Sequence, residues 1–130
     1  TTHQDVAMNV AITAIGMFNK LNIPIVGVIE NMSYLECPKC KEHMTIFGIG
    51  GGKKVSEKFD IPVIGSIPLN PDIMANSDSG NPIPLISPNS DQAQIIDKIA
   101  RQTAGRISII ANELKSQQEA ETAGKVSATT

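Results

Sequence analysis

Two short apolar runs constrain the fold of this chain more than any other feature of its sequence. The first spans residues 23–30, Ile-Pro-Ile-Val-Gly-Val-Ile-Glu, and the second spans residues 61–68, Ile-Pro-Val-Ile-Gly-Ser-Ile-Pro. Continuous runs rich in β-branched residues are typical of strands that are covered on both faces of a parallel sheet. A glycine-rich stretch and a helix expected from about Lys53 to Phe59 lie between them. The pattern therefore predicts two parallel strands joined by a right-handed βαβ crossover.

Three further helices are expected around these strands. Thr2-His-Gln-Asp5 fits the helix-start pattern, so the first helix should run from about Gln4 to Lys20. Its apolar residues cover most of the helix circumference, which predicts burial on more than one side. A short helix should open at Asn70-Pro71-Asp72, and the longest one should begin near Asp91. The longest helix carries one apolar stripe, predicted to be buried: Ile96, Ile99, Thr103, Ile107, Ile110 and Leu114.

The number of strands determines our interpretation of the domain. A chain of 130 residues has room for one domain, yet two strands are too few for a stable open sheet. We interpret residues 1–116 as the C-terminal part of a doubly wound, parallel-sheet α/β domain whose other strands lie on the N-terminal side. From Gln117 to Thr130 the chain is polar and rich in small residues, and we expect a disordered tail there.

Charge and hydropathy argue against several classes of protein. The formal net charge is -2, whereas a nucleic-acid binder usually presents a basic face. No apolar run approaches the roughly 20 residues of a membrane span, and no signal-peptide pattern is present. A single cysteine pair without a wider cysteine framework also argues against secretion. We therefore expect a cytoplasmic protein without nucleic-acid or membrane partners.

Cys37 and Cys40 are the only cysteines of the chain, and their spacing is typical of metal-binding loops. Two thiolates three residues apart can bind one metal centre from a single loop. Charged neighbours and Pro38 indicate an exposed loop, which is not where inert buried thiols lie. A tetrahedral thiolate site or a cubane cluster needs four ligands, so two more must come from elsewhere. The simplest source is the same loop in a second copy of the chain.

Three alternatives remain open for this cysteine pair. The thiols could be structural or incidental. They could form a thioredoxin-like redox pair, although the residues after Cys40 lack the helical pattern that such a pair needs. Zinc is a stronger alternative, in a zinc-stabilised dimerisation or interaction module, because His43 follows Cys40 by three residues and could supply a third ligand.

The glycine run at residues 48–53, Gly-Ile-Gly-Gly-Gly-Lys, does not fit the P-loop pattern. Phe47 stands where that pattern needs Gly, and Lys54 stands where it needs Ser or Thr. The run also does not directly follow a strand. We interpret it as a flexible hinge that leads into the next helix.

Asn31 and Pro68 each follow the carboxyl end of one predicted strand. Ligands of open α/β sheets bind at this edge, and a primary amide matches the donor and acceptor edge of adenine. From the residues alone, however, a strand-ending Asn and a turn Pro are the simpler interpretation.

Six segments of the chain follow one another in a familiar order. They are Thr1-Thr-His-Gln-Asp-Val-Ala7, Val28-Ile-Glu-Asn-Met-Ser-Tyr34, Cys37-Pro-Lys-Cys40, Ile46-Phe-Gly-Ile-Gly-Gly-Gly52, Gly65-Ser-Ile-Pro-Leu69 and Ser77-Asp-Ser-Gly-Asn-Pro-Ile83. Together they resemble the Mrp/ApbC family of iron–sulfur cluster carrier ATPases, which are relatives of MinD and ParA. The resemblance covers residues 1 to about 86, and the last helix fits by position only.

The resemblance implies a function and a set of site residues. It implies a homodimer that binds a labile [4Fe-4S] cluster between two CxxC loops, with Cys37 and Cys40 as ligands and apo iron–sulfur proteins as acceptors. It also implies that Asn31 and the backbone around Pro68 hold the adenine of ATP. A portion of a partitioning-type ATPase with an incidental CxxC is the remaining alternative.

The chain departs from the family pattern at single positions and by an absence. His3, Lys41 and Asn70 stand where the family usually has Pro, Gly and Asp, and none of these changes removes a cluster ligand. The P-loop and the Mg²⁺-binding carboxylate of the family belong to an N-terminal half that this sequence does not include. Positioned phosphate ligands and Mg²⁺ supply nearly all the catalysis of phosphoryl transfer. We therefore expect negligible ATP hydrolysis by this chain alone.

Overall fold

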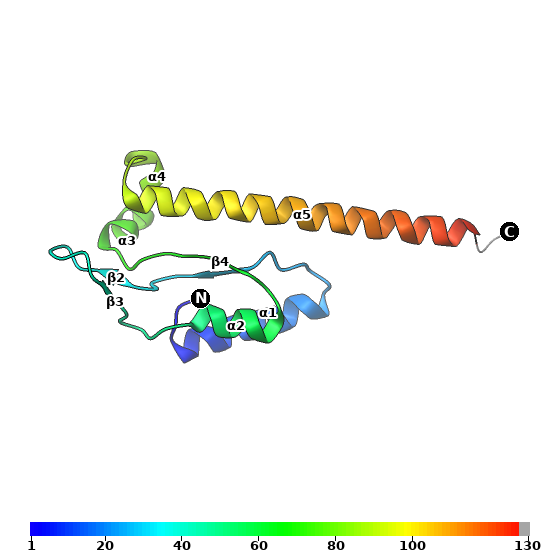
Figure 1. Cartoon of the computed structure of the whole chain (residues 1–130), viewed down its shortest axis with the longest axis horizontal. Helices are drawn as coiled ribbons and strands as arrows, with labels where there is room; N and C mark the ends of the chain where they lie inside the picture. Colours follow the sequence, from blue (N-terminus) through cyan, green and yellow to red (C-terminus); the bar gives the residue numbers. More distant parts are fainter. Residues whose placement is uncertain (128–130) are drawn as a thin grey trace.

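The computed structural model describes residues 1–127, with side chains described for residues 1–120. Two parallel strands lie between two groups of helices (Figure 1). The elements in chain order are α1 (Asp5–Lys20), β1 (Val28–Glu30), β2 (Leu35–Glu36), β3 (His43–Met44), α2 (Gly51–Phe59), β4 (Val63–Ser66), α3 (Pro71–Asp78), α4 (Ile83–Ile86) and α5 (Asp91–Ser127). The predicted α/β architecture with a βαβ crossover is confirmed.

The parallel pair consists of β1 and β4, which are shorter than the apolar runs that predict them. Val28 pairs with Val63 and Glu30 with Ser66, with an irregularity between Val28 and Ile29. Both strands end at the same edge, so the segments that follow them start side by side. The backbone of Thr1 adds to the other side of β1, where its amino group donates to the Ile29 carbonyl at 2.9 Å.

The main core lies between the sheet, α1 and α2. Ile15, Val28 and Val55 form its buried centre, and partly buried residues from the same segments surround them: Ile12, Ile25, Phe59 and Ile61. On the opposite side α5 packs on β4 (Figure 1). Gly65 permits this close approach, because a Cβ atom there would lie 2.5 Å from Cγ1 of Ile99.

Helix α1 has its predicted bounds to within one residue, but its predicted capping is absent. Gln4 is the N-cap residue and makes no side-chain capping bond, so the predicted capping box at Thr2–Asp5 is wrong. Met8 is buried, but the side chains of Val6 and Val10 are 79% and 68% exposed. The helix is thus covered on one side by this chain, and its second apolar side, which suggested burial, has no cover from the described residues.

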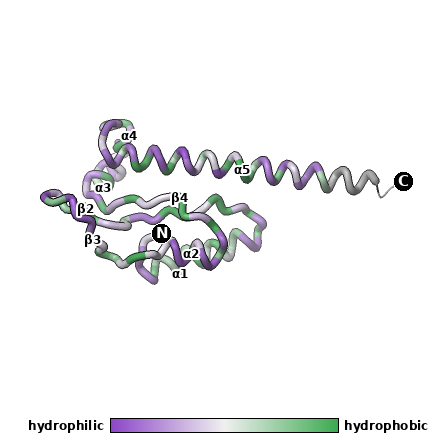
Figure 2. The backbone as a smooth tube through the Cα atoms, viewed as in Figure 1, coloured by the Kyte–Doolittle hydropathy of each residue, from purple (hydrophilic) through white to green (hydrophobic). Residues whose placement is uncertain are grey.

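Helix α5 is 37 residues long and projects beyond the other elements (Figure 1). Hydrophobic and hydrophilic residues alternate along it (Figure 2). Ile99 is buried, whereas Ile107 and Leu114 are about half exposed, so the predicted stripe is buried only in its first part. No helix within residues 1–127 is both long and apolar enough to cross a membrane.

Residues 117–127, where we expected a disordered tail, continue α5 without a break in the structure. The predicted boundary at residue 116 therefore falls inside a helix. This segment is rich in Gln, Glu and Ala, which have a high helix propensity and need no tertiary contact to prolong an existing helix. Residues 128–130 lie outside the described part of the chain.

Helix α3 confirms the predicted start at Asn70. The side-chain oxygen of Asn70 accepts hydrogen bonds from the amides of Asp72 at 2.7 Å and Ile73 at 3.4 Å. A neutral amide therefore caps this helix, at a position where the family that the sequence resembles usually has a carboxylate. The short helix α4, whose Ile83 is buried, was not anticipated from the sequence.

Candidate functional site

The cysteine pair lies at the tip of a β-hairpin formed by β2 and β3. Leu35 pairs with Met44 and Glu36 with His43 in antiparallel register. The Cys37 amide donates to the Glu42 carbonyl at 2.9 Å, which extends the ladder into the tip. The hairpin projects away from the sheet (Figure 1). Sequence analysis missed it because strands of two residues carry no readable alternation.

Backbone amides within the tip are directed at the Cys37 thiol. The amide of Cys40 lowers the pKa of Cys37 most, followed by the amide of Lys39 and the side chain of Cys40. Hydrogen bonds to a thiolate favour the charged form, which is the form that binds metals. Cys37 is partly exposed, Cys40 is exposed, and both are free thiols. The loop thus presents two accessible sulfur atoms, and the pKa of one of them is lowered.

Lys41 closes the tip in a conformation that usually selects glycine. Its φ is 63°, in the left-handed region, which explains the glycine of the resembling family at this position. The Lys41 amide donates to the Cys37 carbonyl at 2.9 Å, and its ammonium group lies 2.8 Å from Oε1 of Glu36. This hydrogen-bonded pair raises the pKa of Lys41 and lowers that of Glu36. The two ends of the tip are thereby joined through both backbone and side chains.

His43 does not join the cysteines as a third ligand. Its ring stacks on Tyr34 with centroids 4.2 Å apart, and its Nε2 atom lies 3.7 Å from Oε2 of Glu36. Burial, and then the charge of Glu36, raise the pKa of Tyr34. Among the described residues no three Cys, His, Asp or Glu side chains are grouped so that they could hold a metal ion. The described residues of one copy therefore offer two thiol groups and no complete site.

The segment leading into the hairpin is fastened to the segment that follows β4. The Ser33 amide and hydroxyl group both donate to the Ile67 carbonyl at 3.0 Å. The Leu69 amide donates to the Tyr34 carbonyl at 2.7 Å. These bonds link the cysteine hairpin to residues 67–69, which lie at the carboxyl edge of the sheet.

The glycine run is a packed helix start, so the predicted flexible hinge is wrong. The amide of Gly51 donates to Nδ1 of His3 at 2.8 Å, and that of Gly52 donates to Oε1 of Glu30 at 2.8 Å. Oε2 of Glu30 accepts from the Ser66 hydroxyl group at 2.8 Å. The side chains of His3 and Glu30 are 4% and 14% exposed. We refer to Glu30, His3, Ser66, Gly51 and Gly52 as the hairpin base.

The hairpin base also accounts for the sequence of the glycine run. A Cβ atom on Gly51 would lie 2.9 Å from Cα of His3, and one on Gly52 would lie 2.6 Å from Oε1 of Glu30. The two amides are already bonded within the chain, which supports the conclusion that this run is not a phosphate loop. Sequence analysis missed Glu30, His3 and Ser66. The only sequence signal is that Glu30 ends the first apolar run and Ser66 is the one polar residue of the second, and His3 gave none.

Asn31 and Pro68 line one cavity of about 500 Å³. Asn31 is exposed, and its side-chain oxygen accepts from the Met32 amide at 3.0 Å. Pro68 is buried. The remaining wall is mostly apolar and includes Leu35, Leu69 and Met74. The structure thus brings the two predicted residues together at the carboxyl edge of the sheet, beside a surface that suits a flat apolar ring.

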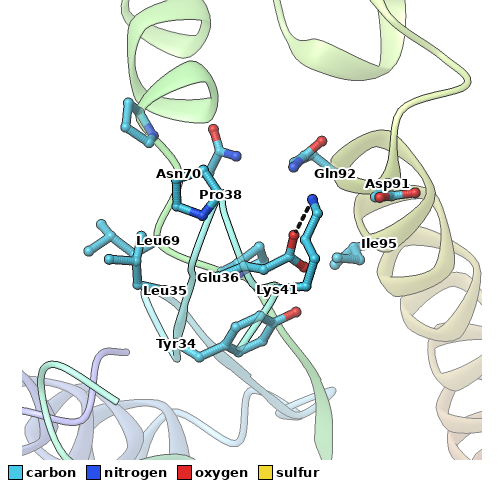
Figure 3. Close-up of a pocket in the computed structure, with 12 residues that line it drawn as sticks. Tyr34, Leu35, Glu36, Pro38, Lys41, Leu69, Asn70, Asp91, Gln92 and Ile95 are labelled. Carbon is cyan, nitrogen blue, oxygen red and sulfur yellow. Dashed lines mark hydrogen bonds and ion pairs between the residues drawn. The ribbon is translucent and has the colours of Figure 1, made fainter. Parts of the chain in front are cut away.

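A second cavity of about 390 Å³ lies between the hairpin and the start of α5 (Figure 3). Its charged residues are Glu36 and Lys41 from the hairpin and Asp91 from α5. It shares several walls with the cavity of Asn31: Leu35, Pro68, Leu69, Asn70 and Pro71. Leu35, two residues before Cys37, therefore contacts both cavities.

Comparison with known proteins reveals close relatives. A family model described as ParA, the NUBPL iron-transfer P-loop NTPase, matches residues 1–104. The iron-sulfur cluster transfer protein NUBPL of Dictyostelium discoideum is 39% identical over 87% of this chain and 35% of its own length. The iron-sulfur cluster carrier protein of Deinococcus radiodurans is 43% identical over 84% of this chain and 31% of its own length. The chain thus spans about a third of the length of these curated relatives.

A solved structure shares the fold. A nucleotide-binding protein from Archaeoglobus fulgidus, in complex with ADP and with cobalt found by PIXE, is 32% identical with a TM-score of 0.56. The match covers 71% of this chain and 37% of that protein. The expectation that this chain forms part of a P-loop NTPase-like parallel-sheet fold is confirmed.

Proposed function

Because the chain belongs to the ParA family of NUBPL iron-transfer P-loop NTPases, we propose that it is the cluster-binding part of an iron–sulfur cluster carrier. The observation that carries this proposal is the tip of the hairpin. Amides of Lys39 and Cys40 favour the Cys37 thiolate, and both sulfur atoms are accessible. The fit to an iron–sulfur cargo rests on these donors, because thiolates are the ligands that such clusters need.

The cargo we propose is a [4Fe-4S] cluster shared by two copies of the chain. Such a cluster takes four thiolates, and one copy supplies Cys37 and Cys40. A twofold axis through the cluster brings the second pair into the same place. Apo iron–sulfur proteins are the proposed acceptors, because exposed ligands leave room for an incoming thiolate to reach the iron. A cytoplasmic location is also proposed, since two free thiols suit a reducing compartment.

The cavity that contains Asn31 and Pro68 is the proposed adenine site of the whole protein. The side-chain amide of Asn31 can donate to and accept from an adenine edge, and the apolar wall of the cavity suits the adenine ring. Phosphate and Mg²⁺ ligands would come from the remainder of a protein of this family. Neither is needed for the thiolates to hold the cargo.

Anaerobic reconstitution with iron and sulfide tests the proposal. The full chain should turn brown and hold one cluster per two copies, and Cys37→Ala or Cys40→Ala should abolish the colour. His43→Ala is the matched control and should keep the cluster, because His43 is engaged with Tyr34 and Glu36. Full iron binding by Cys37→Ala would contradict the proposal. A chain that takes up zinc but never iron would support a zinc-stabilised dimer in its place.

ATP hydrolysis by the chain alone provides a second test, because the proposal assigns the phosphate and Mg²⁺ ligands to the remainder of the protein. We expect the chain alone to hydrolyse no ATP above background, because this sequence has no P-loop and the amides of Gly51 and Gly52 are already bonded to His3 and Glu30. Phosphate release is the measurement. Turnover that survives extensive purification would contradict this expectation and would assign a phosphate site to residues 48–52.

A further inference from the structure

The second half of helix α5 exposes an apolar stripe. Ile107 is 51% exposed and Leu114 is 43% exposed, and Ile110 lies between them. Spacings of three and four residues place these three side chains on one face of the helix. This half of the helix projects beyond the other elements (Figure 1), and it lies beyond residue 104, where the match to the family model ends. The stripe therefore presents an apolar surface outside the part of the chain that matches the family.

Two opposite charges accompany the stripe, and each lacks a partner within residues 1–120. Arg106 directly precedes Ile107, and Glu113 directly precedes Leu114. The two charges are seven residues apart, beyond the three- and four-residue spacings at which side chains of one helix meet. The Nε atom of Arg106 is buried and has no hydrogen-bond acceptor among the described residues. Because buried polar groups are nearly always bonded, Arg106 calls for an acceptor from outside this chain.

The stripe is complementary to itself when two helices run in opposite directions. In the seven-residue repeat of a coiled coil, Ile107, Ile110 and Leu114 take seam positions, and Arg106 and Glu113 take the position that flanks the seam. An antiparallel pair that sets Ile107 of each copy beside Ile110 of the other also brings Arg106 next to Glu113. A twofold axis makes this charge pair occur twice.

A parallel pair lacks this complementarity. It would set Arg106 of each copy beside Ala111 of the other and Glu113 beside Gln118, so that neither charge meets an opposite charge. The order of the charges along the helix thus favours a second, antiparallel copy as the occupant of the stripe.

We propose that α5 pairs antiparallel with α5 of a second copy, with the stripe at the centre and Arg106 of each copy bonded to Glu113 of the other. This interface goes beyond the proposed function and uses no cysteine, because the hairpin and the second half of α5 lie at opposite ends of the molecule (Figure 1). The paired segment is short, so the contact belongs to the small class of interfaces. We expect a dissociation constant on the order of 10–100 µM.

Charge reversal in the metal-free full chain, kept reduced, tests the reciprocal pair. Arg106→Glu and Glu113→Arg each replace two attractions by two like-charge contacts, and each should weaken the dimer about tenfold at low salt. An equimolar mixture of the two variants should dimerise within about twofold of the original dissociation constant, because opposite charges meet again in the mixed pair. Sedimentation equilibrium at low and high salt is the measurement. Arg101→Glu, whose partner is Asp97 at 2.7 Å, is the matched control off the stripe and should leave the dimer unchanged.

A pair of isoleucine variants tests the apolar stripe. Ile107→Gln should weaken the dimer about tenfold, because its side chain lies in the seam of both copies. Ile109→Gln is the matched control, since Ile109 is 48% exposed but lines a cavity beside β4, off the stripe. It should leave the dimer unchanged. Circular dichroism of each variant should show the helix content of the original chain.

Each outcome supports or overturns the pairing independently of the proposed cluster. A metal-free chain that remains monomeric at about 1 mM would overturn it. A dimer that ignores Arg106→Glu, Glu113→Arg and Ile107→Gln would also overturn it, and a mixture no tighter than its two components would refute the antiparallel arrangement. Loss of cluster binding by a chain that still dimerises without metal would contradict the proposed function alone.

Discussion

The tip and the base of the cysteine hairpin are built in opposite ways. The tip is exposed, and its order comes from groups within six residues of one another: amides of Lys39 and Cys40, and the pair of Lys41 and Glu36. The hairpin base is buried and joins segments that are distant in sequence, such as Glu30 and Gly52. Under the proposed function, we expect the tip to determine binding and the base to determine stability. Substitutions in the two places should therefore affect different measurements.

Removing a sulfur atom from the tip should have the largest effect, and it should be confined to binding. Cys37→Ala should lose all bound iron because a ligand is missing from each copy. Its unfolding temperature in the metal-free state should stay within ~2 °C of the original, since the Cys37 side chain is partly exposed. Iron analysis and thermal unfolding of the same preparation check both statements. A large loss of stability would show that the tip also supports the fold.

A methyl group at the hairpin base should have the converse effect. Gly52→Ala pushes on the Glu30 side chain and weakens its bonds to Gly52 and Ser66, so we expect a loss of ~2 kcal/mol in unfolding free energy. Urea unfolding is the measurement. The matched control is Gly105→Ala on α5, where a Cβ atom meets nothing within 4 Å. It should stabilise the chain by ~0.5–1 kcal/mol, and equal effects from both variants would refute the contrast.

The lowered pKa of Cys37 predicts an effect of pH on the tip. Its thiolate persists below the pH at which an ordinary thiol becomes protonated. Its contribution to stability is therefore complete above the ordinary pKa and is lost as the pH falls through the lowered one. In the variant Cys40→Ser, the rate at which iodoacetamide alkylates Cys37 should rise with pH. The midpoint pH of this rise should be lower than the midpoint for N-acetylcysteine. Urea-unfolded chain is the control, and an identical midpoint in the folded chain would remove the support for directed amides.

Glycine at position 41 should have the smallest effect. Lys41→Gly relieves the left-handed backbone at φ 63° and also removes the ion pair with Glu36. These changes oppose each other, and the unfolding temperature should shift by no more than ~2 °C. Thermal unfolding at two salt concentrations checks this. The unfolding temperature of the original chain should depend on salt because of the ion pair between Lys41 and Glu36, and that of the variant should not. A large loss of stability would show that Lys41 determines the shape of the tip.

Sequence reasoning succeeded where structure follows from local pattern. The apolar runs predicted β1 and β4 and their parallel pairing, and Asn70 predicted the start of α3. It failed where contacts between distant segments decide the outcome. The glycine run was interpreted as a hinge because nothing local shows that Glu30 and His3 lie against it. The strands of the hairpin were too short for any periodicity, and the polar composition from Gln117 onward gave no sign that α5 continues there.

The candidate site was predictable in its chemistry but not in its geometry. Cysteine spacing led to the prediction that Cys37 and Cys40 are metal ligands, and the positions after the two strands led to the prediction for Asn31 and Pro68. The role of His43 could not be judged from spacing, because its ring stacks on Tyr34 across the hairpin. The walls common to the two cavities could not be foreseen either, since they depend on how residues 67–69 run beside the hairpin.

The hydrogen bond between Gly52 and Glu30 has a consequence for how this family can diversify. Because the two ends of the hairpin are fastened side by side, everything between them is an insertion into an otherwise ordinary strand-to-helix connection. Each doubling of the length of such an insertion costs only ~0.6 kcal/mol in closure entropy. The cysteine hairpin can therefore lengthen, shorten or change its side chains while the sheet beneath it stays the same.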